Sequence, residues 1–354
     1  MNPVDRADLR ARVARALTAF LGGQREKLLA IDPDLVQVAD AVDAFVLGGG
    51  KRLRPAFAYW GYRGAGGPDS DDVVAAVAAL ELVQASALIH DDVMDASDTR
   101  RGEPALHRRF AALHRERGWV GDARQFGAAG AILLGDLCLV WSDEMMRGAR
   151  LDPAAQLRAR VDFDLMRTEV SAGQYLDMLA QATGEASVAR ATKVATYKSA
   201  KYTVERPLLI GASIADAGKD VRAAYSAYGL PLGEAFQLRD DVLGAFGDPA
   251  RTGKPAGDDL REGKRTYLVA MAMESAEPAQ AARLLGRLGD PDLDDAGVEE
   301  LLGIIRATGA LARTEARIAE LTSRALAALS TVDLLGETRE VLTELAGAAT
   351  RRRG

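Results

Sequence analysis

One segment of the sequence, from Asp71 to Asp95, constrains the fold more than any other. It opens on two aspartates, which suit a helix N-terminus, and it is then apolar almost all round until it reaches Asp91, Asp92 and Asp95. A helix that is apolar on every side has to lie inside a large domain, where it lines a core or a cavity. We therefore expect this helix to be central, with its acidic end at the edge of a buried space.

The remainder of the chain also favours helices. Ala, Leu, Glu and Arg are abundant and aromatic residues make up only 5%, so we predict an all-α fold. Helical spacing of apolar residues predicts further helices over residues 4–30, 34–47, 126–147, 154–182, 187–215 and 220–246, and in most of 267–349 apart from a loop at 289–297. Gly22-Gly23, Pro207 and Pro231 are candidate kinks, and the polar segment 247–264 is expected to be a long functional loop. No break divides the chain, so residues 1–354 are expected to form a single domain.

Composition excludes several classes of protein. The net charge of −6 offers no surface that would neutralise nucleic-acid phosphates, so we expect no nucleic-acid partner. The single cysteine, Cys138, lies in an apolar run and is expected to be a buried, inert thiol, which excludes intrachain disulfides and cysteine-rich zinc sites. The first residues lack the apolar core of a signal peptide, and no run of about 18 uncharged apolar residues occurs. We expect a soluble cytoplasmic protein without a transmembrane segment.

The acidic end of the central helix suggests a metal site. Asp91 and Asp95 are four residues apart, which places them one above the other on one helix face. Their repulsion would cost an exposed helix about 0.2 to 0.5 kcal/mol, and more if the pair were desolvated, so a bound cation is the natural compensation. Carboxylate oxygens suit Mg²⁺. A solvated acidic helix end explains one such motif equally well.

A second acidic cluster makes the metal interpretation stronger. Asp240 and Asp241 stand within another apolar helical frame, with Asp248 beyond them. If the two helices face each other, their carboxylates form a ring that can hold a diphosphate through bridging Mg²⁺. Each nearby cation would by itself be ordinary surface, but together with both clusters these residues are candidate phosphate ligands: Lys51, Arg54, Arg100, Arg101, Lys254 and Lys264.

Other chemistries have little support. Gly48-Gly49-Gly50-Lys51 is not a nucleotide-binding P-loop, because position 45 is Phe and Lys51 precedes Arg52 rather than Ser or Thr. His90 stands alone in an apolar helix and is expected to be structural. The three histidines form no credible Ser-His or Cys-His arrangement, so no covalent nucleophile is expected.

Five segments between residues 48 and 266 carry a resemblance to a known family: GGGKRLRP, LIHDDVMDASDTRRGEPALH, YKSAKYTVERPL, FQLRDDVLGAFGD and GKPAGDDLREGKRT. In this order they resemble the signature segments of the trans-polyprenyl diphosphate synthases, and most of all the bacterial geranylgeranyl diphosphate synthases. The resemblance implies an isoprenoid synthase-type helical bundle around a deep central cavity, and a homodimer. It also implies Mg²⁺-dependent, head-to-tail condensation of isopentenyl diphosphate with dimethylallyl, geranyl or farnesyl diphosphate.

The same resemblance implies a role for each site residue. Asp91, Asp95 and Asp240 would bind three Mg²⁺ ions, with Asp92 and Asp241 supporting them. Isopentenyl diphosphate would be held by Lys51, Arg54, Gln84 and Arg101, and the allylic diphosphate by Arg100, Lys198, Ser199, Gln237, Lys254 and Lys264. Three positions depart from the family pattern: Gly244 replaces the last aspartate of the second motif, with Asp248 as a candidate substitute, Gln84 replaces a histidine and Ser199 a threonine.

Product length should depend on the helix before Asp91. One helical turn rises about 5.4 Å, close to one isoprene unit, so side chains one turn or more before Asp91 should form the wall. Ser86 and Ala87 are small and, with Val83, should not block a fifteen-carbon chain, so we predict a twenty-carbon product. The alternatives are a longer-chain synthase, a class I terpene cyclase, a non-catalytic synthase subunit and a purely structural bundle. Asp240-Asp241 argues against a cyclase, whose second metal motif has Asn, Ser and Glu.

Overall fold

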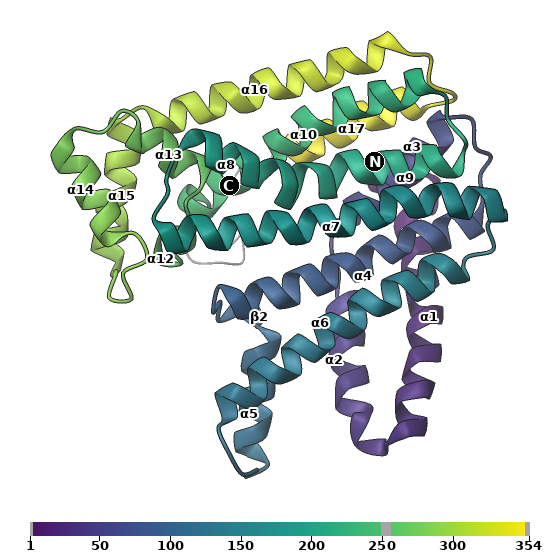
Figure 1. Cartoon of the computed structure of the whole chain (residues 1–354), viewed down its shortest axis with the longest axis horizontal. Helices are drawn as coiled ribbons and strands as arrows, with labels where there is room; N and C mark the ends of the chain where they lie inside the picture. The colour runs from purple at the N-terminus through teal and green to yellow at the C-terminus, as the bar shows by residue number, and fades with distance from the viewer. Residues whose placement is uncertain (1–2, 249–255, 351–354) are drawn as a thin grey trace.

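The computed structural model describes residues 3–248 and 256–350, and these form a helical bundle (Figure 1). Within them the only strands are the two-residue β1 (Thr99–Arg100) and β2 (Glu103–Pro104), which pair as an antiparallel hairpin. The all-α prediction is confirmed. The helices are η1 (Pro3–Asp8), α1 (Leu9–Ile31), η2 (Pro33–Leu35), α2 (Val36–Leu47), α3 (Leu53–Gly64), α4 (Asp71–Met94), α5 (Leu106–Glu116), α6 (Ala123–Gly148), α7 (Pro153–Thr183), α8 (Val188–Val194), η3 (Ala195–Glu205), α9 (Arg206–Ile214), α10 (Lys219–Phe246), α12 (Asp258–Arg261), α13 (Tyr267–Met273), α14 (Pro278–Arg287), α15 (Asp295–Ala307), α16 (Ala310–Ala328), η4 (Leu329–Thr331) and α17 (Thr338–Thr350).

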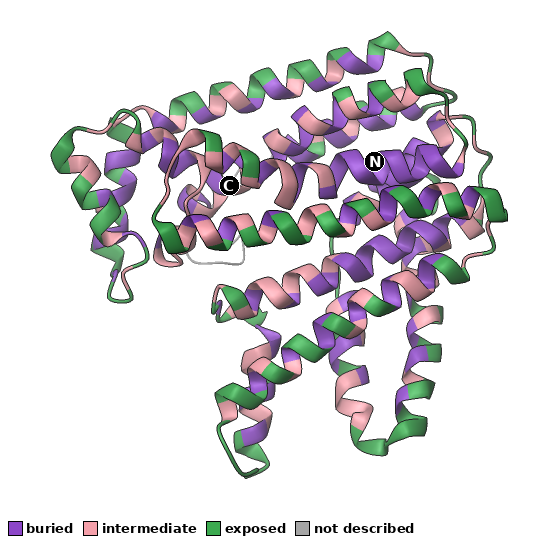
Figure 2. Ribbon diagram, in the orientation of Figure 1, coloured by how far each residue is buried: buried purple, intermediate pink, exposed green. Residues whose placement is uncertain are grey.

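Helix α4 lies at the centre of the bundle, as its sequence predicts. Ser70 caps its N-terminus by accepting a hydrogen bond from the backbone N–H of Val73. Helices α1, α3 and α6 pack around it, while α7, α9 and α10 complete the neighbouring layers (Figure 1). Its first three quarters are buried almost continuously, and exposure increases only towards the acidic end (Figure 2). The apolar helix therefore carries its carboxylates from the core to the edge of the bundle.

Two helices, α4 and α6, are long and apolar enough to cross a membrane by length and composition alone. The apolar window of α4 is 72% buried in the bundle, which accounts for its composition, and that of α6 is 39% buried. Cys138 on α6 is fully buried, and burial raises the pKa of its thiol to about 12, as expected of an inert side chain.

The segment expected to be one helix over residues 187–215 is instead three elements. Helix α8 is followed by η3, an eleven-residue stretch of π-helix, and then by α9. Two glycines let neighbouring helices approach η3 closely: a Cβ on Gly173 of α7 would lie 2.3 Å from the backbone nitrogen of Lys198, and one on Gly233 of α10 would lie 2.4 Å from the Cα of Ala200. The π-helix is thus clamped between α7 and α10.

The candidate kink residues lie at the start of a helix or within one. Pro207 lies in the first turn of α9, where it suits a helix start, and α10 continues through Pro231 without ending. Gly22 and Gly23 lie within the uninterrupted α1. Helix α3 was not predicted, and the segment expected to be a loop over 247–264 contains the short helix α12.

Candidate active site

A cavity of about 470 Å³ runs between α3, α4, α6, α7, η3 and α10. At one end it is polar, and there it brings together residues from segments far apart in the sequence: Asp91, Lys198, Ser199, Gln237 and Asp240. Away from this end its wall includes Val83, Ser86, Ala87, Leu139 and Val170, and Arg54 and Gln84 also line it. One aspartate of each acidic cluster and the three expected chain-length residues therefore share one cavity.

The first acidic cluster is surrounded by cations of the protein. Asp91 accepts hydrogen bonds from the Nζ of Lys198 at 3.1 Å and from the guanidinium of Arg100 at 3.4 Å. Asp92, which is buried, also accepts from Arg100, and Lys264 lies 3.0 Å from Asp95. Burial alone would raise the pKa of the Asp91 carboxyl, but Lys198, Lys264 and Arg100 outweigh it and hold that pKa well below its usual range.

The two lysines of this cluster stay charged despite their burial. Burial lowers the pKa of the Lys198 ammonium, but Asp91 and Asp177 outweigh this and raise it above its usual value. The pKa of Lys264 is raised in the same way by Asp259, Asp95 and Glu262. Both side chains are therefore fixed positive charges beside the first acidic cluster, and Lys198 also lines the cavity.

The second acidic cluster is different in its surroundings. Asp241 is buried and accepts a hydrogen bond from the neutral amide of Gln237 at 2.8 Å. Burial, together with Asp259 and Asp240, raises the pKa of the Asp241 carboxyl to about 7. Lys264, which lies 3.6 Å from Asp259, offsets part of the repulsion among these carboxylates.

A carboxylate from α12 occupies the space beside Gly244, where the expected aspartate is missing. A Cβ on Gly244 would lie 2.0 Å from the Oδ2 of Asp259, so this carboxylate lies directly against the glycine. The backbone N–H of Gly257, just before α12, donates to the carbonyl of Gly244 at 3.1 Å. Asp259, rather than Asp248, is therefore the acid that adjoins position 244.

Arg52, which was not among the candidate site residues, anchors the glycine-rich segment 48–51. Arg52 has a left-handed backbone, with a φ of 51°, and its buried guanidinium bonds to the carboxylate of Glu81 and, at 2.7 Å, to the carbonyl of Val46. This anchor fixes the backbone between Lys51 and Arg54. The guanidinium of Arg101 is directed to the same segment, donating to the carbonyls of Gly49 at 3.2 Å and Phe45 at 3.3 Å.

Arg54 is positioned by the π-helix. Its guanidinium stacks over the ring of Tyr202 at 4.1 Å and donates to the Oγ1 of Thr203 at 2.8 Å. The hydroxyl of Tyr202 in turn donates to the Oε1 of Gln84 at 2.6 Å. Gln84 and Arg54 thus lie on either side of one buried tyrosine.

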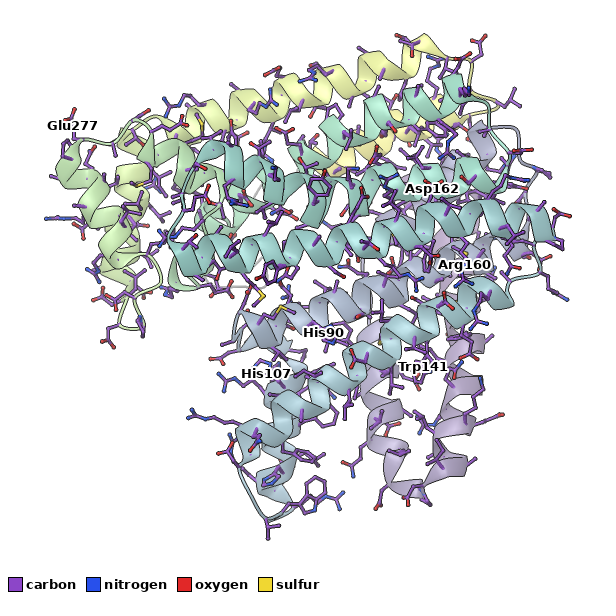
Figure 3. The ribbon with its side chains drawn as sticks, in the orientation of Figure 1. His90, His107, Trp141, Arg160, Asp162 and Glu277 are labelled. Atoms are coloured by element: carbon purple, nitrogen blue, oxygen red, sulfur yellow. The ribbon has the colours of Figure 1, made fainter. Side chains whose placement is uncertain are left out.

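Three functional candidates were missed by the sequence reasoning: Gln174, Asp177 and Asp259. Gln174 donates to the Oδ1 of Asp91 at 3.2 Å, and Asp177 accepts from the Nζ of Lys198 at 2.6 Å. The signal available was the polar pair Gln174 and Asp177 directly after Gly173 on a helix. Lys254 lies outside the described residues. His90 contacts the backbone oxygen of Ile132 at 3.1 Å and packs against Gly135 on α6 (Figure 3).

The carboxylates fit a site for Mg²⁺ that is shared with a substrate. Within residues 3–248 and 256–350 no three acidic or other ligand side chains already form a closed metal cage. Mg²⁺ is commonly held by one or two carboxylates together with waters and substrate phosphates, so an incomplete protein cage is what such a site needs. The hard oxygens of Asp91 and Asp240, which line the cavity, and of Asp95, one turn beyond Asp91, match that chemistry, as does the proximity of Asp241 to Asp240 and Asp259.

Comparison with known families gives one extended match. Residues 36–305 match the family described as polyprenyl synthetase. A geranylfarnesyl diphosphate synthase from Aeropyrum pernix is 31% identical over 322 residues, which cover 90% of this chain and 94% of that protein. A geranylgeranyl diphosphate synthase from Methanosarcina mazei is 35% identical over 227 residues, 64% of each chain.

Comparison with solved structures agrees. A crystal structure of geranylgeranyl pyrophosphate synthase from Corynebacterium glutamicum, complexed with isoprenyl diphosphate and magnesium, superposes with a TM-score of 0.95. The two sequences are 42% identical, and the alignment covers 98% of this chain and 99% of the other.

Proposed function

The chain belongs to the polyprenyl synthetase family of trans-prenyl diphosphate synthases, and we propose that it makes geranylgeranyl diphosphate from isopentenyl diphosphate and an allylic diphosphate. The single observation that carries the proposal is the cavity, which joins a polar end suited to diphosphates to an apolar wall of small residues on α4. Ser86 and Ala87 leave room where a bulky side chain would stop a fifteen-carbon chain.

We assign the allylic diphosphate to the polar end formed by both acidic clusters. Asp91, Asp95 and Asp240 would hold Mg²⁺, three ions in all, which supplies charge neutralisation for the departing diphosphate. Arg100, Lys198, Lys264 and Gln237 would bind the same group, joined by Ser199 and, from outside the described residues, Lys254. Asp92 and Asp177 orient Arg100 and Lys198, and Asp241 supports Asp240.

We assign isopentenyl diphosphate to Lys51, Arg54, Arg101 and Gln84. The support is their placement: Arg52 anchors the glycine-rich segment, Arg101 reaches it, and Tyr202 links Arg54 to Gln84. The amide of Gln84 keeps the hydrogen-bonding ability of the histidine that it replaces.

The proposed reaction needs no nucleophilic side chain. The C1–O bond of the allylic diphosphate breaks, and the diphosphate leaves with the electron pair. The double bond of isopentenyl diphosphate then attacks the allylic C1 and forms the new C–C bond. A proton lost from C2 of the isopentenyl unit, which restores a double bond, can pass to the released diphosphate. The fixed charges of Lys198, Lys264 and Arg100 stabilise that leaving group.

We propose a homodimer that associates through α6 and α7. These helices expose a set of large apolar side chains: Ile132, Leu133, Val140, Leu157, Val161 and Leu165. Exposed apolar groups in such number on neighbouring helices suit an interface between subunits. We further propose that residues 1–354 form one domain and that the enzyme is cytoplasmic.

Incubation of the purified chain with Mg²⁺, isopentenyl diphosphate and the five-, ten- or fifteen-carbon allylic diphosphate tests the function. Chromatography of the products should show a twenty-carbon prenyl diphosphate, and chelation of Mg²⁺ should abolish it. Replacement of Ala87 by Phe should shorten the product by narrowing the wall. A main product longer than twenty carbons would refute the proposed product length. Failure to elongate any of the three starters would refute the synthase activity.

A further inference from the structure

We propose that Arg167 of α7, held by Asp143 of α6, forms a charged floor of the cavity and thereby ends chain elongation at twenty carbons. The inference rests on the proposed function, since it concerns how far a prenyl chain can extend from the diphosphate end. It assigns product length to an ion pair on α6 and α7 in addition to the small residues of α4.

The spacing of residues on α7 sets the depth of Arg167. Gln174, which donates to Asp91 at 3.2 Å, marks the diphosphate end of this helix. Val170 and Ser171 lie about one turn before Gln174 in the chain, and Arg167 lies two turns before it. Gln174 and these three residues all line the cavity. Seven residues of helix rise about 10.5 Å, so the Cα of Arg167 lies at about that distance along α7 from the level of Gln174. Its guanidinium, directed to Phe163 and Asp164, lies about one further turn away.

Helices α4 and α6 give a consistent depth. His90 of α4 contacts the carbonyl of Ile132, so the first half of α6 lies beside the acidic end of α4. Leu139 lines the cavity further along α6, and Asp143, one turn beyond it, accepts from Arg167 at 3.3 Å. Val83, eight residues before Asp91, lines the cavity on the α4 side.

Arg167 is held firmly in place. Its guanidinium also donates to Asp164 and stacks over the ring of Phe163 at 4.6 Å. Asp143 is further paired with Arg147 at 2.6 Å and Arg160 at 3.5 Å. A prenyl chain that pushed past this point would have to desolvate an ion-paired guanidinium without offering it a hydrogen bond, which is unfavourable.

The depth accounts for the stopping point. Two helical turns rise about 10.8 Å, enough for about two isoprene units beyond the unit that bears the diphosphate, and the guanidinium lies about one turn, or one further unit, deeper. A farnesyl chain of three units would therefore fit in the allylic position. A geranylgeranyl chain of four units would meet Arg167, so the product of one addition to farnesyl diphosphate could not bind again as an allylic substrate.

The test compares Arg167→Ala with Arg160→Ala in the full-length enzyme with Mg²⁺. Arg160 is a matched control: it lies seven residues earlier on α7, pairs with the same Asp143 and Asp164, and does not line the cavity. Figure 3 shows it on α7, towards the end of the helix away from His90. The starters are farnesyl and geranylgeranyl diphosphate, with isopentenyl diphosphate in excess.

Wild-type enzyme and Arg160→Ala should extend farnesyl diphosphate to twenty carbons and leave geranylgeranyl diphosphate unchanged. For Arg167→Ala the ratio of products of twenty-five or more carbons to twenty-carbon product should rise by about tenfold or more, because the floor is removed. Arg167→Met, which retains apolar packing on Phe163, and Asp143→Asn, which releases the guanidinium, should shift the ratio in the same direction. Thermal unfolding identifies the variants that fold.

An unchanged ratio in every folded variant of Arg167 and Asp143 would overturn the inference. So would an equal shift in Arg160→Ala, since that would implicate the surface charges rather than the floor. If the wild-type enzyme fails to elongate farnesyl diphosphate, the proposed function is overturned. The proposal of a charged floor then fails as well, because it rests on that function.

Discussion

The two acidic clusters each contribute one aspartate, Asp91 and Asp240, to the same cavity, but the surroundings of the clusters differ. At the end of α4, Asp91, Asp92 and Asp95 each contact a lysine or an arginine. On α10, Asp241 contacts the neutral Gln237 and lies close to other carboxylates, which with burial raise its pKa to about 7. Cations of the protein therefore hold Asp91 ionised, whereas burial and neighbouring carboxylates oppose the ionisation of Asp241.

This difference suggests a division of work in the proposed site. The cations around the first cluster are placed by several elements: Lys198 by η3, Arg100 by β1 and Lys264 by the segment after α12. They are positioned to bind an arriving diphosphate as well as to pair with carboxylates. Lys264 also lies 3.6 Å from Asp259, which adjoins Gly244, so this lysine contacts carboxylates on both sides of the site. We expect Asp241 to gain more from bound Mg²⁺ than Asp91, because its pKa is raised whereas that of Asp91 is lowered.

The largest effect is expected from Asp91→Asn. Loss of this carboxylate removes a proposed metal ligand and leaves Lys198 with only part of its negative surroundings, so turnover should fall by about a thousandfold or more. Steady-state kinetics with farnesyl and isopentenyl diphosphates measure the loss, with Asp98→Asn, an exposed acid beyond the same helix, as the control. Near-normal turnover of a folded Asp91→Asn enzyme would contradict the assignment of the first cluster.

A second, smaller effect should follow from Asp259→Asn. If Asp259 supplies the carboxylate that Gly244 lacks, its loss should weaken Mg²⁺-dependent activity by about tenfold to a hundredfold. The apparent affinity for Mg²⁺, measured by thermal stabilisation with Mg²⁺ and inorganic diphosphate, should fall in parallel. Asp248→Asn is the matched control, because Asp248 was the alternative candidate.

A rescue experiment tests whether Asp259 takes the place of the aspartate that is missing at position 244. Gly244→Asp alone should clash with Asp259, since even a Cβ there would lie 2.0 Å from its carboxylate. Combined with Asp259→Gly, it should recover part of the lost Mg²⁺ affinity. If the double variant is no better than Asp259→Gly, Asp259 does not replace the missing aspartate.

A more modest change is expected for Asp177→Asn. Asp177 accepts from Lys198 at 2.6 Å but belongs to neither acidic cluster, so its loss should misplace the lysine without removing a metal ligand. The KM for the allylic diphosphate should rise by about fivefold to tenfold with little change in kcat. Glu185→Gln, at the end of α7 beyond the cavity, should leave both constants unchanged. A fivefold to tenfold fall in kcat, in place of the rise in KM, would instead indicate that Asp177 acts in the chemical step.

The smallest effect on activity should come from Glu169→Gln, which should act on stability. Glu169 of α7 accepts from Arg206 at 2.6 Å and from Lys201 at 2.7 Å, and so ties α7 to η3 and α9. Burial opposes ionisation of Glu169, but these cations outweigh it and lower its pKa in the folded state. The variant should lose about 1 to 3 kcal/mol of unfolding free energy at neutral pH.

The loss of stability in Glu169→Gln should depend on pH in a direction set by the lowered pKa of Glu169. Because the folded-state pKa of Glu169 is lowered, its stabilising contribution is complete above the pKa of the unfolded state and disappears as the pH falls through the folded value. Denaturant unfolding at pH 7 and in acid should therefore show wild type and Glu169→Gln converging at low pH. A constant difference between them would show that packing rather than ionisation matters.

Much of the fold could be predicted from local pattern. The apolar run of α4 predicts a central helix, and the spacing of Asp91 and Asp95 predicts a shared face, because helical periodicity depends only on the chain itself. The prediction over 187–215 was less accurate, since the π-helix arises from the close approach of Gly173 and Gly233 of other helices. Helix α3 was missed because its positions follow a glycine-rich segment and it is apolar on nearly all sides.

The candidate site divides in the same way. Asp91, Asp240, Lys198 and Gln237 could be named from the motifs, and the structure places all four on one cavity. Asp259 could not be recognised as the neighbour of Gly244, because fifteen residues separate them and the packing of α12 on α10 brings them together. No sequence pattern singled out Arg167. An arginine three residues after an aspartate, here Asp164, is typical of an exposed helix surface, and its pairing with Asp143 of α6 is visible only in the structure.

By itself the sequence determined the helical class, the two carboxylate clusters and the types of ligand that they can bind, because these depend on residue chemistry and on spacing within one helix. Only the tertiary structure decided which cations lie beside which carboxylates, which acid adjoins Gly244 and which residues line the cavity. Those features arise from contacts between helices distant in the chain, and no periodicity along a single segment can encode the distance between them.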